Sequence, residues 1–145
     1  MSWPEPCALI GILDDGWAGL SDSARQRLAV AELVIGTGRT LALVRPWLSA
    51  TAIIRDMDGA LGALPDWILS ARAAGQRVAV LATGDPLCHG IASWLTDRLG
   101  RDGVDILPNV STLQLAFARF KTPWQDIRIA SCHRADAGEW FVGAT

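Results

Sequence analysis

The chain has 145 residues, 50% of them hydrophobic, and its 13 basic and 15 acidic side chains give a net charge of −2. This length is enough for one domain with a substantial core and too short for two of full size. The scattered basic residues exclude the charged patch of a nucleic-acid binder, and no apolar run approaches the ~20 residues of a membrane span. Three widely spaced cysteines form no disulfide framework, so we expect a cytoplasmic protein that binds neither nucleic acid nor membrane.

Apolar runs typical of strands alternate along the chain with stretches typical of helices. The runs that we expect to form strands lie at residues 7–12, 33–35, 52–54, 77–82, 104–107 and 127–131. The stretches that we expect to form helices lie at residues 22–31, 39–48, 64–74, 91–99 and 111–120. Alternation of this kind predicts an α/β fold with right-handed crossovers.

Local signals support these elements. Ser21 and Ser111 are good helix N-caps, and Gly75 is placed to end a helix. Residues 77–82 (RVAVLA) are apolar without alternation, which is typical of a parallel strand covered on both faces. We therefore expect a mainly parallel sheet of about five strands with helices on both faces.

The same reading divides the chain into four parts. Residues 1–6 form a tail, residues 7–120 an α/β domain, and residues 121–126 a linker. The strand expected at 127–131 opens a further segment, 127–145, which we interpret as the start of a second α/β domain that the chain does not complete.

Three loops that follow strands are rich in turn residues: 13–19 (LDDGWAG), 83–90 (TGDPLCHG) and 108–112 (PNVST). In open parallel sheets, ligands bind beyond the carboxyl ends of the strands. If the sheet is parallel, the three loops open on the same edge and form a candidate ligand site.

The loop at 83–90 is the most informative of the three. Gly84 lets the backbone approach a ligand closely, Asp85 adds a carboxylate, and Pro86 fixes the turn. The alternative is an ordinary turn in which Asp85 caps the next helix, because Asp and Pro are common turn residues.

Other site types fit less well. The first loop has Leu13 between Gly11 and Gly16, so it lacks the glycine trio of a dinucleotide site, and the acid expected about 20 residues later is missing. The adjacent pairs Cys88-His89 and Cys132-His133 lack the ligand spacing of a zinc site, and we expect no metal.

Taken in order, the segments ALIGILDDGWAGLS, VAVLATGDPLCHGI and ILPNVSTLQLAFARFKTPWQD resemble the tetrapyrrole methylase family. Within it they look most like the cobalamin-pathway enzymes that methylate C5 of a precorrin. The resemblance covers residues 8–134, nearly the whole chain. It implies two α/β domains with S-adenosylmethionine bound in the cleft between them.

The resemblance also implies the site and its partners. The family's cofactor contacts fall here on Leu13, Asp14, Thr83, Gly84, Asp85, Cys88, Ser111 and Thr112. Asp85 is the candidate catalytic residue, and Arg39 is a candidate partner for substrate carboxylates. The implied reaction transfers a methyl group to C5 of a precorrin-6B-type or cobalt-precorrin macrocycle and leaves S-adenosylhomocysteine. A homodimer is expected, and a C15-methylating decarboxylase unit is either fused or separate.

Three departures from the family pattern bear on the site. Leu13 and Asn109 replace usual glycines, and Cys88-His89 replaces two aromatic residues. Two alternatives stay open: a non-catalytic fragment that folds and dimerises, and a tetrapyrrole methylase that acts on another ring carbon.

Overall fold

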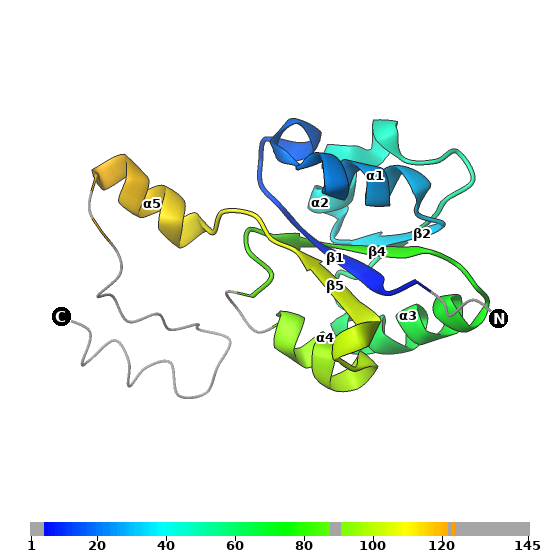
Figure 1. Cartoon of the computed structure of the whole chain (residues 1–145). Helices are drawn as coiled ribbons and strands as arrows, with labels where there is room; N and C mark the ends of the chain where they lie inside the picture. Colours follow the sequence, from blue (N-terminus) through cyan, green and yellow to red (C-terminus); the bar gives the residue numbers. More distant parts are fainter. Residues whose placement is uncertain (1–4, 88–90, 122, 124–145) are drawn as a thin grey trace. The chain divides into compact units, whose positions relative to one another are not determined.

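The computed structural model describes residues 5–87, 91–121 and 123 (Figure 1). The strands are β1 (Cys7–Ile12), β2 (Leu33–Gly36), β3 (Ile53–Asp56), β4 (Val78–Thr83) and β5 (Val104–Leu107). The α-helices are α1 (Asp22–Val30), α2 (Gly38–Val44), α3 (Leu64–Ala73), α4 (Ile91–Leu99) and α5 (Thr112–Phe120). Short 3-10 turns are η1 (Gly16–Gly19), η2 (Arg45–Trp47), η3 (Leu61–Ala63) and η4 (Arg101–Gly103). The chain divides into two compact units, 1–109 and 110–145.

The first unit contains a five-stranded sheet in the order β3-β2-β4-β1-β5, and every neighbouring pair is parallel. All six residues of β1 are buried, as are five of the six in β4. The parallel sheet predicted from uninterrupted apolar runs is therefore confirmed.

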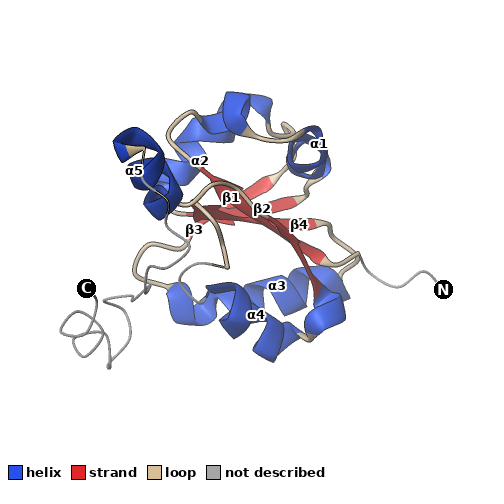
Figure 2. Ribbon diagram, turned by 60° about the vertical axis from the view of Figure 1, so that its left-hand side comes forward, coloured by secondary structure: helices blue, strands red, loops and turns tan. Residues whose placement is uncertain are grey.

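Helices cover both faces of the sheet, as predicted (Figure 2). On one face α1 and α2 pack Leu28 and Leu41 against side chains such as Ile10 of β1. On the other face α3 and α4 pack Ile68 and Leu95 against the opposite side of the same strands. Burial on both faces fixes the strands and so fixes the loops that leave their carboxyl ends.

The helix ends follow the expected signals. The Ser21 hydroxyl accepts a hydrogen bond from the Ala24 N–H at 3.2 Å, which caps α1. Gly75 has a φ of 76°, the left-handed conformation that ends a helix. The helix expected at 39–48 begins one residue earlier, capped by Thr37, and Pro46 lies in η2 where α2 stops.

Two local features differ from the sequence-based expectation. The strand expected at 52–54 runs from Ile53 to Asp56, so its loop begins at Met57. The first glycine loop is not irregular, because it contains η1. Among the described residues, no helix is both long and apolar enough to cross a membrane.

The second unit is described through α5. Ser111 and Gln114 form a capping box: the Gln114 N–H donates to the Ser111 hydroxyl at 3.1 Å, and the Ser111 N–H donates to the Gln114 amide oxygen at 2.8 Å. The predicted cap at Ser111 is confirmed. The expected linker 121–126 lies largely, and the segment 127–145 wholly, outside the described residues, so the division at residues 120 and 126 stays a prediction.

Candidate functional site

Gly11, near the end of β1, is the point at which three strand ends meet. A Cβ atom on Gly11 would collide with the Gly84 carbonyl oxygen and would lie 3.0 Å from both the Asn109 nitrogen and the Pro86 Cδ. The loop after β4 and the first residues after β5 therefore close directly on the β1 backbone. This confirms the predicted convergence for the first two loops and for Pro108 and Asn109.

The loop after β4 is held by backbone and side-chain hydrogen bonds. Gly84 has a φ of 74° and donates its N–H to the Ile12 carbonyl at 2.8 Å. Asp85 accepts a hydrogen bond from the Leu87 N–H at 3.0 Å, an Asx turn. Asp85 is half-buried and Pro86 is buried. The turn considered for Asp85 is present in the structure, and the expected cap on the next helix stays a prediction, because α4 begins only at Ile91.

The first loop presents Leu13 half-buried and Asp14 exposed. The Leu13 carbonyl accepts the Gly16 N–H at 2.9 Å, which closes a tight turn. Asp14 forms an ion pair with Arg39 in the first turn of α2. Sequence reasoning assigned Asp14 to the cofactor and Arg39 to the substrate separately, whereas the structure brings the two side chains together.

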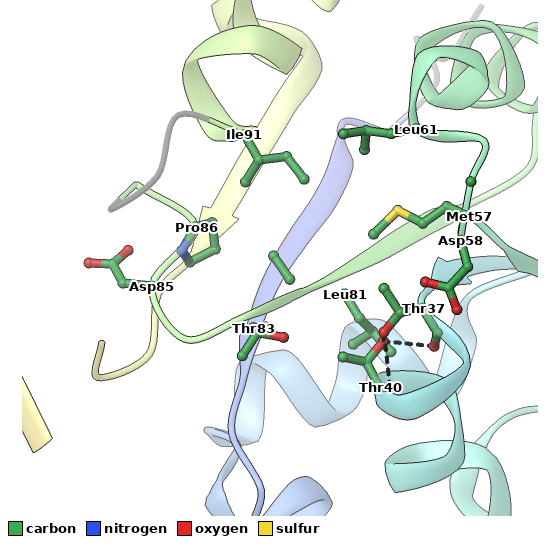
Figure 3. Close-up of a pocket in the computed structure, with 12 residues that line it drawn as sticks. Thr37, Thr40, Met57, Asp58, Leu61, Leu81, Thr83, Asp85, Pro86 and Ile91 are labelled. Atoms are coloured by element: carbon green, nitrogen blue, oxygen red, sulfur yellow. Dashed lines mark hydrogen bonds between the residues drawn. The ribbon is translucent and has the colours of Figure 1, made fainter. Parts of the chain in front are cut away.

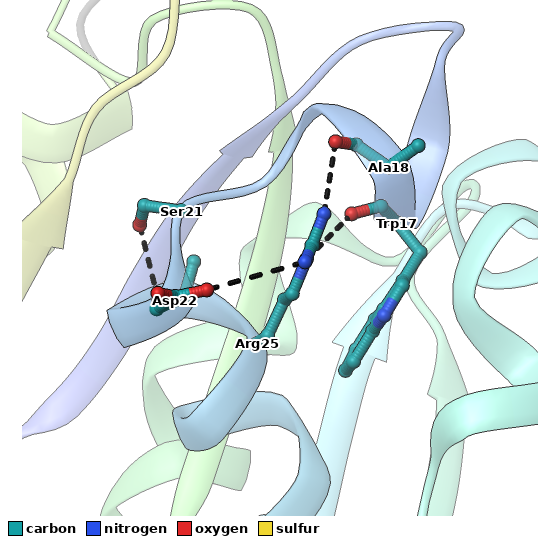
Figure 4. A network of polar contacts seen from close by, with 6 residues as sticks. Trp17, Ala18, Ser21, Asp22 and Arg25 are labelled. Carbon is teal, nitrogen blue, oxygen red and sulfur yellow. Dashed lines mark hydrogen bonds and ion pairs between the residues drawn. The ribbon is translucent and has the colours of Figure 1, made fainter.

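Arg25 of α1 anchors η1, which continues this first loop (Figure 4). Its guanidinium donates to the carbonyls of Trp17 at 3.0 Å and Ala18 at 2.9 Å. The Trp17 ring in turn stacks on Trp47, with centroids 5.3 Å apart and planes 3° from parallel. The loop that carries Asp14 is thus tied to α1 and to η2.

A pocket of about 340 Å³ lies beside the loop after β4 (Figure 3). Thr83, Asp85 and Pro86 line it from that loop, and Thr37 and Met57 line it from the residues that follow β2 and β3. Figure 3 shows the Asp85 carboxylate turned away from the other lining side chains. The pocket therefore sits at the carboxyl edge, where an open parallel sheet binds its ligands.

Sequence analysis missed the pocket residues that follow β3, which are Met57, Asp58 and Gly59. The rule that located the three glycine loops applies equally to this fourth loop, because β3 is parallel to its neighbour. Their loop was overlooked because the strand was expected to end at residue 54.

Three polar side chains that line the pocket, those of Thr37, Thr40 and Asp58, form hydrogen bonds with neighbours. Asp58 accepts the Gly38 N–H at 3.1 Å. The Thr40 hydroxyl donates to the Thr37 carbonyl at 3.1 Å and also contacts the Thr37 hydroxyl at 3.2 Å. These bonds fix the start of α2 against the loop after β3.

The remaining predicted site residues lie either outside the described residues or in the second unit. Cys88 is outside the described residues, as are His89, Cys132 and His133. Ser111 caps α5 and Thr112 is its first residue, and both belong to the second unit. Among the described residues, no group of three His, Cys, Asp or Glu side chains is placed to hold a metal ion.

Cys7 is buried in β1, and its thiol is expected to be unreactive. Burial raises the pKa of its thiol from 9.0 to about 12. Because the thiolate is the nucleophile of cysteine chemistry, Cys7 is a core residue rather than a catalytic one.

Comparisons with known proteins identify the family and the fold. A model of the family "Tetrapyrrole (Corrin/Porphyrin) Methylases" matches residues 6–142. A precorrin-6Y C(5,15)-methyltransferase (decarboxylating) of Mycobacterium tuberculosis is 36% identical over 129 residues, which are 85% of this chain and 30% of that protein. A probable cobalt-precorrin-7 C(5)-methyltransferase of Methanocaldococcus jannaschii is 28% identical over 105 residues, 71% of this chain and 48% of that protein.

Solved structures share the fold. The methyltransferase CobJ has a TM-score of 0.71 at 22% identity, covering 88% of this chain and 55% of its own. The cobalamin biosynthesis precorrin-6Y methylase CbiE of Archaeoglobus fulgidus has a TM-score of 0.61 at 25% identity, covering 88% of this chain and 65% of its own. The chain spans about 30% of the length of the Mycobacterium relative. With a family model that matches 6–142, the chain belongs to the tetrapyrrole (corrin/porphyrin) methylase family.

Proposed function

We propose that this protein transfers the methyl group of S-adenosylmethionine to C5 of a precorrin-type macrocycle in cobalamin biosynthesis. The observation that carries the proposal is the closure of the Gly84–Pro86 turn on Gly11 at the carboxyl edge of the sheet. Support comes from the relatives, which are named as C5 or C5,15 methyltransferases of precorrins and cobalt-precorrins.

The chemistry of the loops suits this cofactor. Asp14 and Asp85 place carboxylates on the two loops that close at Gly11, and the cofactor carries an ammonium and a sulfonium cation. The backbone of Leu13, Thr83 and Gly84 is expected to contribute the remaining contacts of this unit. The proposed contacts of Cys88, Ser111 and Thr112 stay predictions.

When bound, S-adenosylmethionine supplies a methyl group already activated on a sulfonium. The protein then has to hold the acceptor carbon against it. Positioning of this kind can lower the activation free energy by about 7–11 kcal/mol. The loop after β4 is suited to that task because it packs directly against the Gly11 backbone. Asp85 shapes this loop through its bond to the Leu87 N–H, and its catalytic role stays a prediction.

The wider setting of the reaction is also part of the proposal. The acceptor is a precorrin-type tetrapyrrole, with or without cobalt, and a fused or separate unit performs methylation at C15. A homodimer and a cytoplasmic location stay predictions. Sedimentation of the purified protein tests the first, and fractionation of the source cell tests the second.

Calorimetry with S-adenosylhomocysteine tests the cofactor proposal. The measurement is made on this chain and on the protein at the length that its source cell makes. We expect the natural-length protein to bind one molecule per subunit. Binding by the natural-length protein alone would mean that this chain is a fragment that folds without holding the cofactor. Failure of both to bind contradicts the proposal.

A further inference from the structure

The pocket of Figure 3 borders the loop after β4 on the side of β2 and β3, away from the loop that carries Leu13 and Asp14. In the sheet order, β2 and β3 flank β4 on one side, and β1 and β5 lie on the other. Leu13 and Asp14 follow β1, whereas Thr37 and Met57 follow β2 and β3. Among the described residues, Thr83 and Asp85 belong both to the pocket lining and to the predicted cofactor contacts.

Ten of the twelve described residues that line the pocket are uncharged. Met57, Leu61 and Ile91 surround it with hydrocarbon and a thioether sulfur (Figure 3). Among the described residues that line it, none is Lys or Arg; Asp58 contributes a carboxylate, whereas the Asp85 carboxylate is turned away (Figure 3). A ligand carboxylate placed here would meet like charge without a compensating cation, which is strongly unfavourable.

The position of the pocket matches what methyl transfer demands of the acceptor. The reacting atoms must approach to about 3–3.5 Å, so the acceptor has to adjoin the cofactor loop. The pocket borders that loop at Thr83 and Asp85. Its volume of about 340 Å³ is at the small end of the ~300–1,000 Å³ typical of ligand sites, which is room for part of a macrocycle.

We infer that this pocket receives an uncharged ring edge of the tetrapyrrole acceptor and that the carboxylate substituents of the macrocycle stay outside it. The inference rests on the proposed function and extends it, because it places the acceptor beside the loop after β4, on the side of β2 and β3.

Leu61 offers a direct test because its side chain is 50% exposed at the pocket, so substitution there spares the core. The variant Leu61→Glu brings a charge to an apolar wall. The matched control is Leu69→Glu on α3, where the leucine is 46% exposed and outside the lining. Two dissociation constants are measured on the protein at its natural length. One is for hydrogenobyrinic acid, a corrin with free acetate and propionate groups, by tryptophan fluorescence; the other is for S-adenosylhomocysteine, by calorimetry.

We expect Leu61→Glu to weaken corrin binding by about tenfold or more, since a charge in an apolar site costs over 1.4 kcal/mol. Binding of S-adenosylhomocysteine should stay unchanged, and Leu69→Glu should change neither constant. If Leu61→Glu fails to fold, Leu61→Gln takes its place with a smaller loss in the same direction.

The outcomes separate this inference from the proposed function. Unchanged corrin binding in the Leu61 variant overturns the inference, as does weaker S-adenosylhomocysteine binding, which would assign the pocket to the cofactor. An unsubstituted protein that binds S-adenosylhomocysteine but not the corrin also overturns it. An unsubstituted protein that binds neither compound contradicts the proposed function itself.

Discussion

The side-chain amide of Asn109 donates a hydrogen bond to the Gly11 carbonyl at 3.3 Å, and so joins the chain after β5 to the β1 backbone. The family pattern has a glycine here, and Asn tolerates the left-handed conformation that a glycine allows. Asn109 does not use that tolerance, because among the described residues Lys121 alone, apart from glycines, has a positive φ. Its side chain instead adds a link between two strand ends.

Gly11→Ala should destabilise the protein and abolish S-adenosylhomocysteine binding. The added methyl group meets backbone atoms of Gly84 and Asn109, which cannot move without displacing both loops. Overpacking of this kind costs about 1–3 kcal/mol of unfolding free energy, measurable by urea denaturation.

The matched control is Gly62→Ala, where an added Cβ has no atom within 4 Å. Its unfolding free energy should change by less than about 0.5 kcal/mol, with cofactor binding intact. A Gly11→Ala protein that binds S-adenosylhomocysteine normally would show that closure at this point is not needed.

Arg25→Ala should loosen the first loop. The substitution removes two hydrogen bonds to carbonyls of η1 and the cation over the Trp17 ring at 5.9 Å. We expect a loss of about 1–2 kcal/mol in unfolding free energy. Arg98→Ala, which removes a guanidinium 5.4 Å from the Trp94 ring, serves as the control for a lost ring contact. Equal losses in the two variants would refute an anchoring role for Arg25.

Asp14→Asn should leave stability nearly unchanged. The side chains of Arg39 and Asp14 are 73% and 81% exposed, and exposed pairs contribute about 0–1 kcal/mol. Asp105→Asn is the comparison, because Arg27 is 27% exposed and also holds the Pro6 carbonyl at 2.8 Å. Denaturation in low and high salt should show a larger loss for Asp105→Asn. A larger loss for Asp14→Asn would mean that the loop pair is structural.

Cys7 should resist alkylation in the native protein at pH 8 and react once urea unfolds it, as peptide mass mapping would show. Burial raises the pKa of its thiol to about 12, so the folded state keeps a proton that the unfolded state loses near pH 9.0. Unfolding free energy therefore falls as pH rises from about 9 toward 12. Alkylation of native Cys7 at pH 8 would contradict its burial.

Local sequence signals predicted most of the fold. The uninterrupted apolar run at 77–82 indicated a buried parallel strand, and β4 is one. The caps at Ser21 and Ser111 and the stop at Gly75 were also foreseen, because each depends on a few neighbouring residues. The convergence of loops followed from the parallel topology alone.

Local signals could not predict contacts between residues that are distant in the sequence. The Trp17–Trp47 stack joins positions 30 residues apart and the Asp14–Arg39 pair positions 25 apart, and no periodicity in either segment indicates the partner. The pocket was missed for another reason: β3 is a largely exposed edge strand with a weak apolar pattern, so the loop that begins at Met57 was not recognised.

Methyl transfer to a precorrin can be followed by tracing the methyl group itself. The protein at its natural length is incubated with S-adenosylmethionine carrying an isotope-labelled methyl group and with a precorrin-6B-type acceptor, and the product is examined by NMR. We expect the label on C5 of the macrocycle. Label on another ring carbon, or no transfer by a protein that binds both compounds, would contradict the proposed function.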